Sequence, residues 1–187
     1  MIDILSAFGL SAATGLNAYL PLLIVGLLAR FTDLVNLQPP WSTLEHPAVL
    51  IVLAVLLIVE MTVDKIPAVD SINDAIQTFI RPAAGALLFA ASANAVTDVS
   101  PALALICGLL VAVGVHAAKA TARPVITAST MGVANPVVSV AEDLVSGTTT
   151  VVAILLPAVA AIIVLLLLAL FLWWTIRRRQ RRTQNGK

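Results

Sequence analysis

The chain has 187 residues, of which 60% are hydrophobic and 11% are charged, and its formal net charge at pH 7 is +1. Because a soluble domain usually has about a quarter of its residues charged, this composition leaves too little polar surface to cover a globule in water. It excludes a cytosolic enzyme, a DNA-binding module, a secreted disulfide scaffold and a disordered linker. The sequence therefore predicts an all-α polytopic membrane helical bundle that forms one integral domain, residues 1–175.

Residues 4–29 are long and apolar enough to cross a bilayer, which takes about 20 residues. The letters GLNAYLP at residues 15–21 interrupt this segment with a glycine, an asparagine and a proline. The segment starts after Asp3 and lacks the positive charges of a secretory signal, so we expect it to stay in the mature protein. The sequence predicts a broken or re-entrant helix near residues 15–21.

Residues 47–63 predict a second span, with Glu60 as its one carboxylate. Residues 67–80 are amphipathic instead: Asp70 and Asp74 lie on one helical face, and apolar side chains gather on the other. We therefore expect an interfacial or cavity-lining helix at 67–80.

Two shorter spans are predicted at 82–97 and 101–118, and both are rich in small residues. Small side chains let helices approach closely, so these spans are expected to pack against protein more than against lipid. The one cysteine, Cys107, lies in the second of them. It excludes an intrachain disulfide and is expected to be a small core residue.

Residues 125–141 are apolar enough to enter the bilayer, but they contain threonines, serines, Gly132, Asn135 and Pro136. Non-helical backbone survives at membrane depth only where protein or a water-filled cavity covers it. The sequence therefore predicts a broken or re-entrant helix near residues 132–136.

Residues 151–174 carry no charge and end on two tryptophans, which predicts the last span. Six of the eleven lysines and arginines lie in the last eleven positions, so residues 176–187 are predicted to form a basic cytoplasmic tail. Membrane lipids are its expected partners. Nucleic acid is not an expected partner, because no aromatic residues are interleaved with these arginines.

If the segment at 125–141 crosses completely, the chain has six spans and both termini are cytoplasmic. The cytoplasmic loops then collect Lys65, Arg81, Lys119 and Arg123, and Arg30 alone lies outside, in agreement with the positive-inside rule. Five spans would place those four residues on the wrong side. We therefore expect about six spans in the cytoplasmic (inner) membrane.

Charged residues in or near spans are costly unless they are paired, and they commonly mark pathways for ions, protons or substrates. Two groups of charged residues fall on or beside single helical faces. The acidic group, with the lysine that follows it, is Glu60, Asp64 and Lys65. The basic group is His116, Lys119 and Arg123. We expect the two groups to face each other across a protein-lined space. The alternative is that they are interfacial groups that only hold helices together.

Four further polar residues complete the candidate transport or binding site: Asn17, Asn135, Glu142 and Asp143. The two asparagines lie at the helix breaks, where a break frees backbone groups that can coordinate an ion or an anionic headgroup. The alternative is a proline kink whose free groups are satisfied by neighbouring threonine and asparagine side chains.

Enzyme signatures are mostly missing, since the chain has no zinc-protease motif, no nucleophile elbow and no phosphate-binding glycine loop. Asp70 and Asp74 resemble half of the magnesium-binding pattern of membrane prenyltransferases, and the other half is absent. The cofactor is therefore unknown. A magnesium-dependent membrane enzyme that acts on a lipid phosphate stays an alternative, with Arg123 on the phosphate.

Three blocks of sequence carry a wider resemblance: GLNAYLPLL near the start, VDKIPAVDSINDAIQTFIRPAAGA in the middle and ARPVITASTMGVANPVVSVAED later. Together they resemble an uncharacterised bacterial membrane-protein family, domain of unknown function 4126. The resemblance covers nearly the whole chain up to about residue 146. It implies a small integral membrane protein and gives no activity.

These observations favour a small membrane carrier or channel for an ion or a small solute, including an anionic one. Glu60 and Asp64 are the expected proton- or cation-sensitive pair, and the basic group supplies counter-charges. Because so few short helices enclose little volume, we expect a homo-oligomer. The remaining alternative is a non-catalytic membrane assembly subunit.

Overall fold

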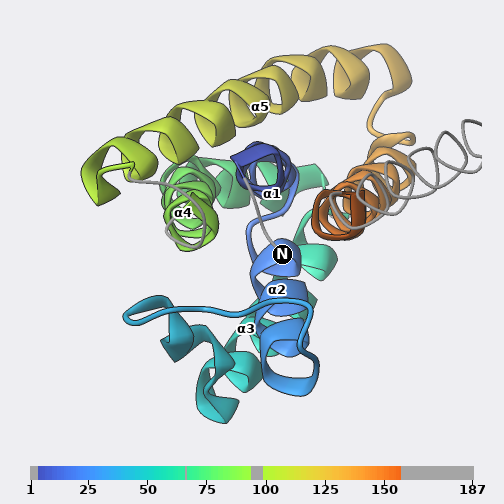
Figure 1. Ribbon diagram of the computed structural model, residues 1–187. Coiled ribbons are helices and arrows are strands. Elements are labelled where there is room, and N and C mark those ends of the chain that lie inside the picture. Colours follow the sequence, from blue (N-terminus) through green and yellow to red (C-terminus); the bar gives the residue numbers. More distant parts are fainter. Residues whose placement is uncertain (1–3, 66, 94–98, 157–187) are drawn as a thin grey trace, which may run out of the picture.

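The computed structural model of the protein describes residues 4–65, 67–93 and 99–156 (Figure 1), with the backbone alone described at 67–72. The predicted tail at 176–187 and most of the predicted last span at 151–174 lie outside the described residues. Every regular element of the described part is a helix, which confirms the all-α prediction.

The described helices follow one another along the chain with short connections. Their bounds are α1 (Ile4–Leu16), α2 (Tyr19–Phe31), the 3-10 helix η1 (Trp41–Glu45), α3 (Pro47–Val63), α4 (Pro67–Ala93) and α5 (Pro101–Thr130). A further helix covers Asn135–Leu156. Proline opens α3 and α5, because its missing N–H is not needed in the first turn of a helix.

The first predicted span consists of two helices, α1 and α2, which are separated at Asn17 and Ala18. The side-chain carbonyl of Asn17 accepts hydrogen bonds from the backbone N–H groups of Tyr19 at 3.1 Å and Leu20 at 3.0 Å. It thereby supplies acceptors that the first turn of α2 would otherwise lack. The predicted break near residues 15–21 is confirmed.

α4 joins two segments that the sequence suggested were separate, the amphipathic stretch at 67–80 and the expected span at 82–97. Pro82 lies inside the helix and does not end it, as is tolerated where neighbouring helices pack around the lost hydrogen bond. The polar face points into the protein, since Gln77 and Arg81 are buried and Phe79 is 80% exposed. The first half of α4 therefore lines the interior.

α5 is longer than the span predicted at 101–118 and includes the start of the segment at 125–141. It ends where Met131 and Gly132 adopt left-handed conformations, with φ of 51° and 81°, which is a common helix ending. The N–H of Gly132 donates to the carbonyl of Thr127 at 2.9 Å. The predicted break near 132–136 is thus a turn between two helices, and residues 125–141 do not form a helix of their own.

α5 lies across α1 and α4, and small residues make this close contact possible (Figure 1). The buried face of α5 runs in steps of three or four residues: Ala104, Gly108, Ala112, His116, Lys119 and Arg123. A Cβ atom on Gly108 would lie 2.5 Å from the Cβ of Phe89 and would also collide with the backbone oxygen of Gly85. One helical stripe therefore provides close packing at its start and basic side chains further along.

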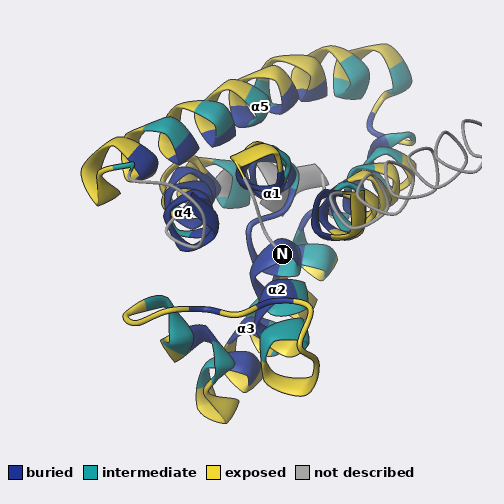
Figure 2. Cartoon of the chain, in the orientation of Figure 1, coloured by how far each residue is buried: buried dark blue, intermediate teal, exposed yellow. Residues whose placement is uncertain are grey.

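The outer surface carries large apolar side chains. Figure 2 shows exposed residues along the outer side of α5, and Ile51, Phe79 and Leu110 are all largely exposed. Two helices of the described part, Pro101–Thr130 and Asn135–Leu156, are long and apolar enough to cross a membrane. They indicate a membrane protein.

Candidate functional site

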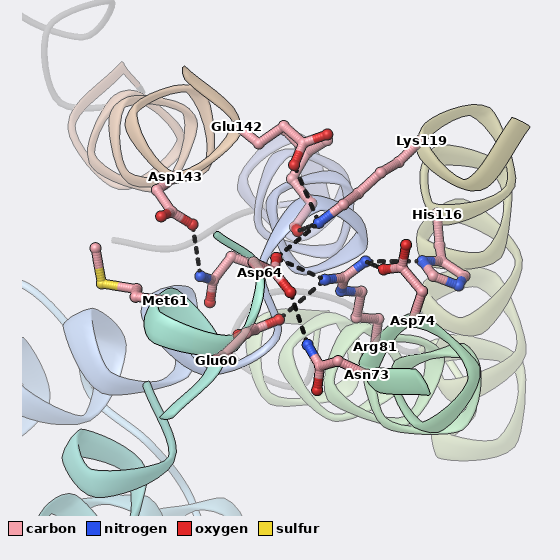
Figure 3. A network of polar contacts seen from close by, with 12 residues as sticks. Glu60, Met61, Asp64, Asn73, Asp74, Arg81, His116, Lys119, Glu142 and Asp143 are labelled. Atoms are coloured by element: carbon pink, nitrogen blue, oxygen red, sulfur yellow. Dashed lines mark hydrogen bonds and ion pairs between the residues drawn. The ribbon is translucent and has the colours of Figure 1, made fainter. Parts of the chain in front are cut away.

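Charged side chains from α3, α4, α5 and the helix Asn135–Leu156 meet in the interior (Figure 3). We call these seven residues the charge network: Glu60, Asp64, Asp74, Arg81, Lys119, Arg123 and Glu142. Glu60 lies in the last turn of α3, and Asp64 is the residue that ends this helix. The network therefore joins four helices of the described part.

Arg81, on α4, lies at the centre of the charge network and is fully buried. Its Nη2 atom lies 3.1 Å from Glu60 Oε1 and 3.6 Å from Asp64 Oδ2, and its Nη1 atom lies 3.4 Å from Asp74 Oδ1. A guanidinium that leaves water loses hydration free energy, which only well-placed partners of opposite charge replace. These contacts attach α4 to the end of α3.

The basic face of α5 supplies the other two cations. Lys119 Nζ lies 3.2 Å from Asp64 Oδ2 and 3.1 Å from Glu142 Oε2, and it also donates to the backbone oxygen of Leu16 at 3.1 Å. Arg123 pairs with Glu142 and lies 3.6 Å from Asp64 Oδ2. The acids at the end of α3 and the bases of α5 thus face each other, as the sequence analysis expected.

Asp64 is the carboxylate with the most partners. Asn73 Nδ2 donates to its Oδ1 at 2.7 Å, and the three cations of the network surround its Oδ2. Burial by itself would raise the pKa of this carboxyl, but Lys119, Arg81 and Arg123 outweigh burial and hold the pKa of Asp64 below its usual 3.8. Asp64 is therefore ionised at neutral pH.

His116, on α5, contacts two residues of α4, Arg81 and Thr78, and it does so as a neutral side chain. Arg81 Nη1 lies 3.0 Å from His116 Nδ1, and Thr78 Oγ1 lies 3.0 Å from His116 Nε2. Because a guanidinium only donates, Nδ1 accepts and carries no proton. The proton is then on Nε2, which donates to Thr78. The sequence analysis grouped His116 with the cations, whereas this geometry makes it an acceptor for one of them.

The described part of the charge network has four carboxylates and three cations. Glu60 is 1% exposed, and its Oε2 atom has no hydrogen-bond partner among the described residues. A buried carboxylate oxygen without a donor is unfavourable, and it is a ready acceptor for a proton, a cation or a donor group. The network can therefore accommodate one more positive charge at Glu60.

The remaining predicted site residues lie beside the charge network or away from it. Asn17 Nδ2 donates to Asp143 Oδ1 at 2.9 Å, so the break between α1 and α2 contacts the last described helix. The side chain of Asn135 accepts from Thr127 Oγ1 at 3.0 Å across the turn after α5. Lys65 is half-buried and donates to the backbone oxygen of Met61 at 2.7 Å.

The predicted magnesium pair consists of Asp70 and Asp74. Asp74 accepts from Arg81, and the side chain of Asp70 lies outside the described residues. Within 4–65, 67–93 and 99–156, no group of three or more His, Cys, Asp or Glu side chains is arranged to hold a metal ion. The cofactor stays unknown.

Sequence reasoning missed the central position of Arg81 and the supporting roles of Asn73 and Thr78. The available signal was an arginine directly before Pro82, the first residue of a predicted span, because a charge at the start of a span is costly without partners. Its spacing of seven from Asp74 also places both on one face of α4. Its contact with Glu60 lies 21 residues away in the sequence, and local periodicity does not predict it.

Residues 4–178 match the family model described as Domain of unknown function (DUF4126). No curated protein and no solved structure matches the chain. The match covers most of the chain, including the whole charge network and the two candidate membrane helices. The protein therefore belongs to the DUF4126 family of unknown function.

Proposed function

We propose that the protein is a multi-pass carrier or channel of the cytoplasmic membrane for an ion or a small solute, with the charge network as its ion-sensitive element. One observation carries this proposal: the charge network, in which Arg81 and Glu60 are buried, has one carboxylate more than its described cations, and Glu60 Oε2 has no hydrogen-bond partner among the described residues. A buried carboxylate oxygen without a hydrogen-bond partner is energetically unfavourable, and intramembrane carboxylates commonly bind protons or cations.

The pairing pattern supports a network that rearranges. Asp64 Oδ2 lies within 3.6 Å of Arg81, Lys119 and Arg123, so a small displacement exchanges its partners without leaving a cation unpaired. A proton or cation on Glu60 would weaken its attraction for Arg81. Since these pairs connect α3, α4 and α5, occupancy at Glu60 would shift the balance between two helix arrangements, which is the coupling that a carrier requires.

A flux measurement tests the proposal. The full chain is reconstituted into liposomes, and proton, potassium and chloride fluxes are followed separately with ion-selective dyes. Glu60→Gln keeps the shape of the side chain and an acceptor for Arg81 but removes the charge. We expect flux of one of these ions through the wild-type protein and a loss of about tenfold or more in Glu60→Gln. Glu45→Gln, on η1 outside the charge network, is the matched control and retains flux.

Two results would contradict the proposal. Liposomes with the wild-type protein would leak no faster than empty liposomes for any of the three ions, or Glu60→Gln would transport as well as the wild type. Thermal unfolding would first show that both variants are folded. Either outcome would then mean that the network holds the helices together and takes no part in transport.

A further inference from the structure

A recess separate from the charge network lies between α2, the end of α3 and the helix Asn135–Leu156, with a volume of about 520 Å³. Apolar side chains form most of its wall: Leu20, Ile24, Val140, Leu144, Val151 and Val152. Recesses of this volume hold ligands of drug size. By volume and lining, this recess suits one apolar chain.

One wall of the recess carries a buried carboxylate, Asp143, which is 8% exposed. Its Oδ1 atom accepts from Asn17 Nδ2 at 2.9 Å. Its Oδ2 atom is buried and has no hydrogen-bond partner among the described residues. A carboxylate oxygen in this condition has lost water without gaining a donor. A ligand that places a donor against Oδ2 would remove that cost.

The charges around Asp143 favour a positively charged donor. The neighbouring charge network has more carboxylates than cations in its described part. Two lysines of the described part have other partners: Lys119 is engaged by Asp64 and Glu142, and Lys65 donates to the backbone oxygen of Met61. A primary ammonium fits Oδ2 because it donates hydrogen bonds and carries the complementary charge.

We infer that the recess is a binding site for a single-chain lipophilic amine, with its ammonium on Asp143 Oδ2 and its apolar chain along the wall between α2 and the helix Asn135–Leu156. The site lies outside the charge network, so the inference does not depend on the proposed transport. A binding measurement therefore tests it even if no ion flux is found.

Equilibrium binding of radiolabelled decylamine to the full chain in phosphatidylcholine nanodiscs tests the site. Phosphatidylcholine provides a membrane whose quaternary ammonium donates no hydrogen bond. We expect saturable binding that Asp143→Asn weakens about tenfold or more, since a charge-assisted hydrogen bond is lost. Asp33→Asn removes an exposed carboxylate elsewhere and should bind like the wild type. Decanoate should compete poorly, because it brings a second negative charge.

A second variant keeps the test decisive if Asp143→Asn fails to fold. Gly147 lines the recess, and a Cβ atom there meets the flexible end of Leu20 at 3.3 Å. Gly147→Leu adds a bulky side chain at the recess and should abolish binding. The inference is overturned if the wild type binds no decylamine saturably, if decanoate binds as well as decylamine, or if folded Asp143→Asn or Gly147→Leu binds like the wild type. Displacement of decylamine by phosphatidylethanolamine would overturn the assignment to a single-chain amine.

Discussion

Each buried charge of the network is stabilised by neighbouring side chains of opposite charge, and Arg81 has three such neighbours. It is fully buried and contacts three carboxylates. A buried ion pair adds little net stability compared with apolar packing, but removal of one partner leaves the others uncompensated. The charge network therefore makes the positions of the helices depend on every one of its members.

Arg81→Met should destabilise the protein strongly. The substitution keeps an unbranched side chain but leaves Glu60 and Asp74 without their cation, and loss of one partner of a buried pair costs about 3–5 kcal/mol. Denaturant unfolding of the detergent-solubilised protein measures the free energy of unfolding. Arg30→Met removes an exposed arginine at the end of α2 and should change little. Equal stabilities for the two variants would contradict the central position of Arg81.

The lowered pKa of Asp64 predicts how the free energy of unfolding depends on pH. Its pKa in the folded protein lies below the usual 3.8, so its ionised form stabilises the fold fully above that pH. This contribution is lost as the pH falls from 3.8 through the lowered pKa. Thermal unfolding midpoints recorded from about pH 6 downward should therefore fall more steeply for the wild type than for Asp64→Asn. Parallel curves would show that Asp64 makes no such contribution.

At the level of helices, the close contact of α5 with α1 and α4 depends on glycine residues. Gly108 is buried on α5 and leaves no space for a Cβ atom beside Gly85 and Phe89. Gly114, on the same helix, is exposed and has no atom within 4 Å of an added Cβ. The two glycines therefore differ in packing while they share a helix.

Gly108→Ala should lower the free energy of unfolding by about 1–3 kcal/mol, because α5 must move away from α4 to admit the methyl group. Gly114→Ala should raise it by about 0.5–1 kcal/mol through the better helix propensity of alanine. Thermal unfolding of both variants under the same detergent conditions gives the comparison. If both substitutions stabilise the protein, the predicted steric restriction at Gly108 is wrong.

Several element boundaries could be predicted from local sequence, and others could not. The break at Asn17 and the turn at Gly132 were predicted because glycine and asparagine permit turn conformations and proline lacks the N–H that a helix interior needs. The continuation of α4 through Pro82 was not, because a proline inside a helix is tolerated only when neighbouring helices compensate. Neighbours of that kind are known only from the fold.

At the scale of the whole molecule, the described part has a buried charge network and large apolar side chains on its outer surface. Arg81, Lys119 and Glu60 are buried, while Leu110 on α5 is largely exposed. Water would penalise that exterior, whereas lipid would not. This distribution is what a protein with lipid around it requires.

Leu110→Lys should therefore reduce the amount of folded protein in membranes. Leu110 lies in a helix long and apolar enough to cross a membrane, where a lysine near the helix centre costs about 2.5–3.5 kcal/mol. Asp33→Lys, in the exposed connection after α2, is the control and should be tolerated. Folded yield is measured by size-exclusion chromatography after extraction from membranes. A Leu110→Lys variant recovered as fully as the control would indicate that this face meets water.

Composition and local patterns determined the all-helical class, the preference for a membrane and the two groups of charges on single helical faces, because these depend on hydropathy and on spacing along one helix. The tertiary structure alone decided that α5 lies across α4, that Arg81 contacts acids on α3, and that Asn17 contacts Asp143 across 126 residues. Contacts between distant segments follow from how helices pack, and that packing is set by all side chains together.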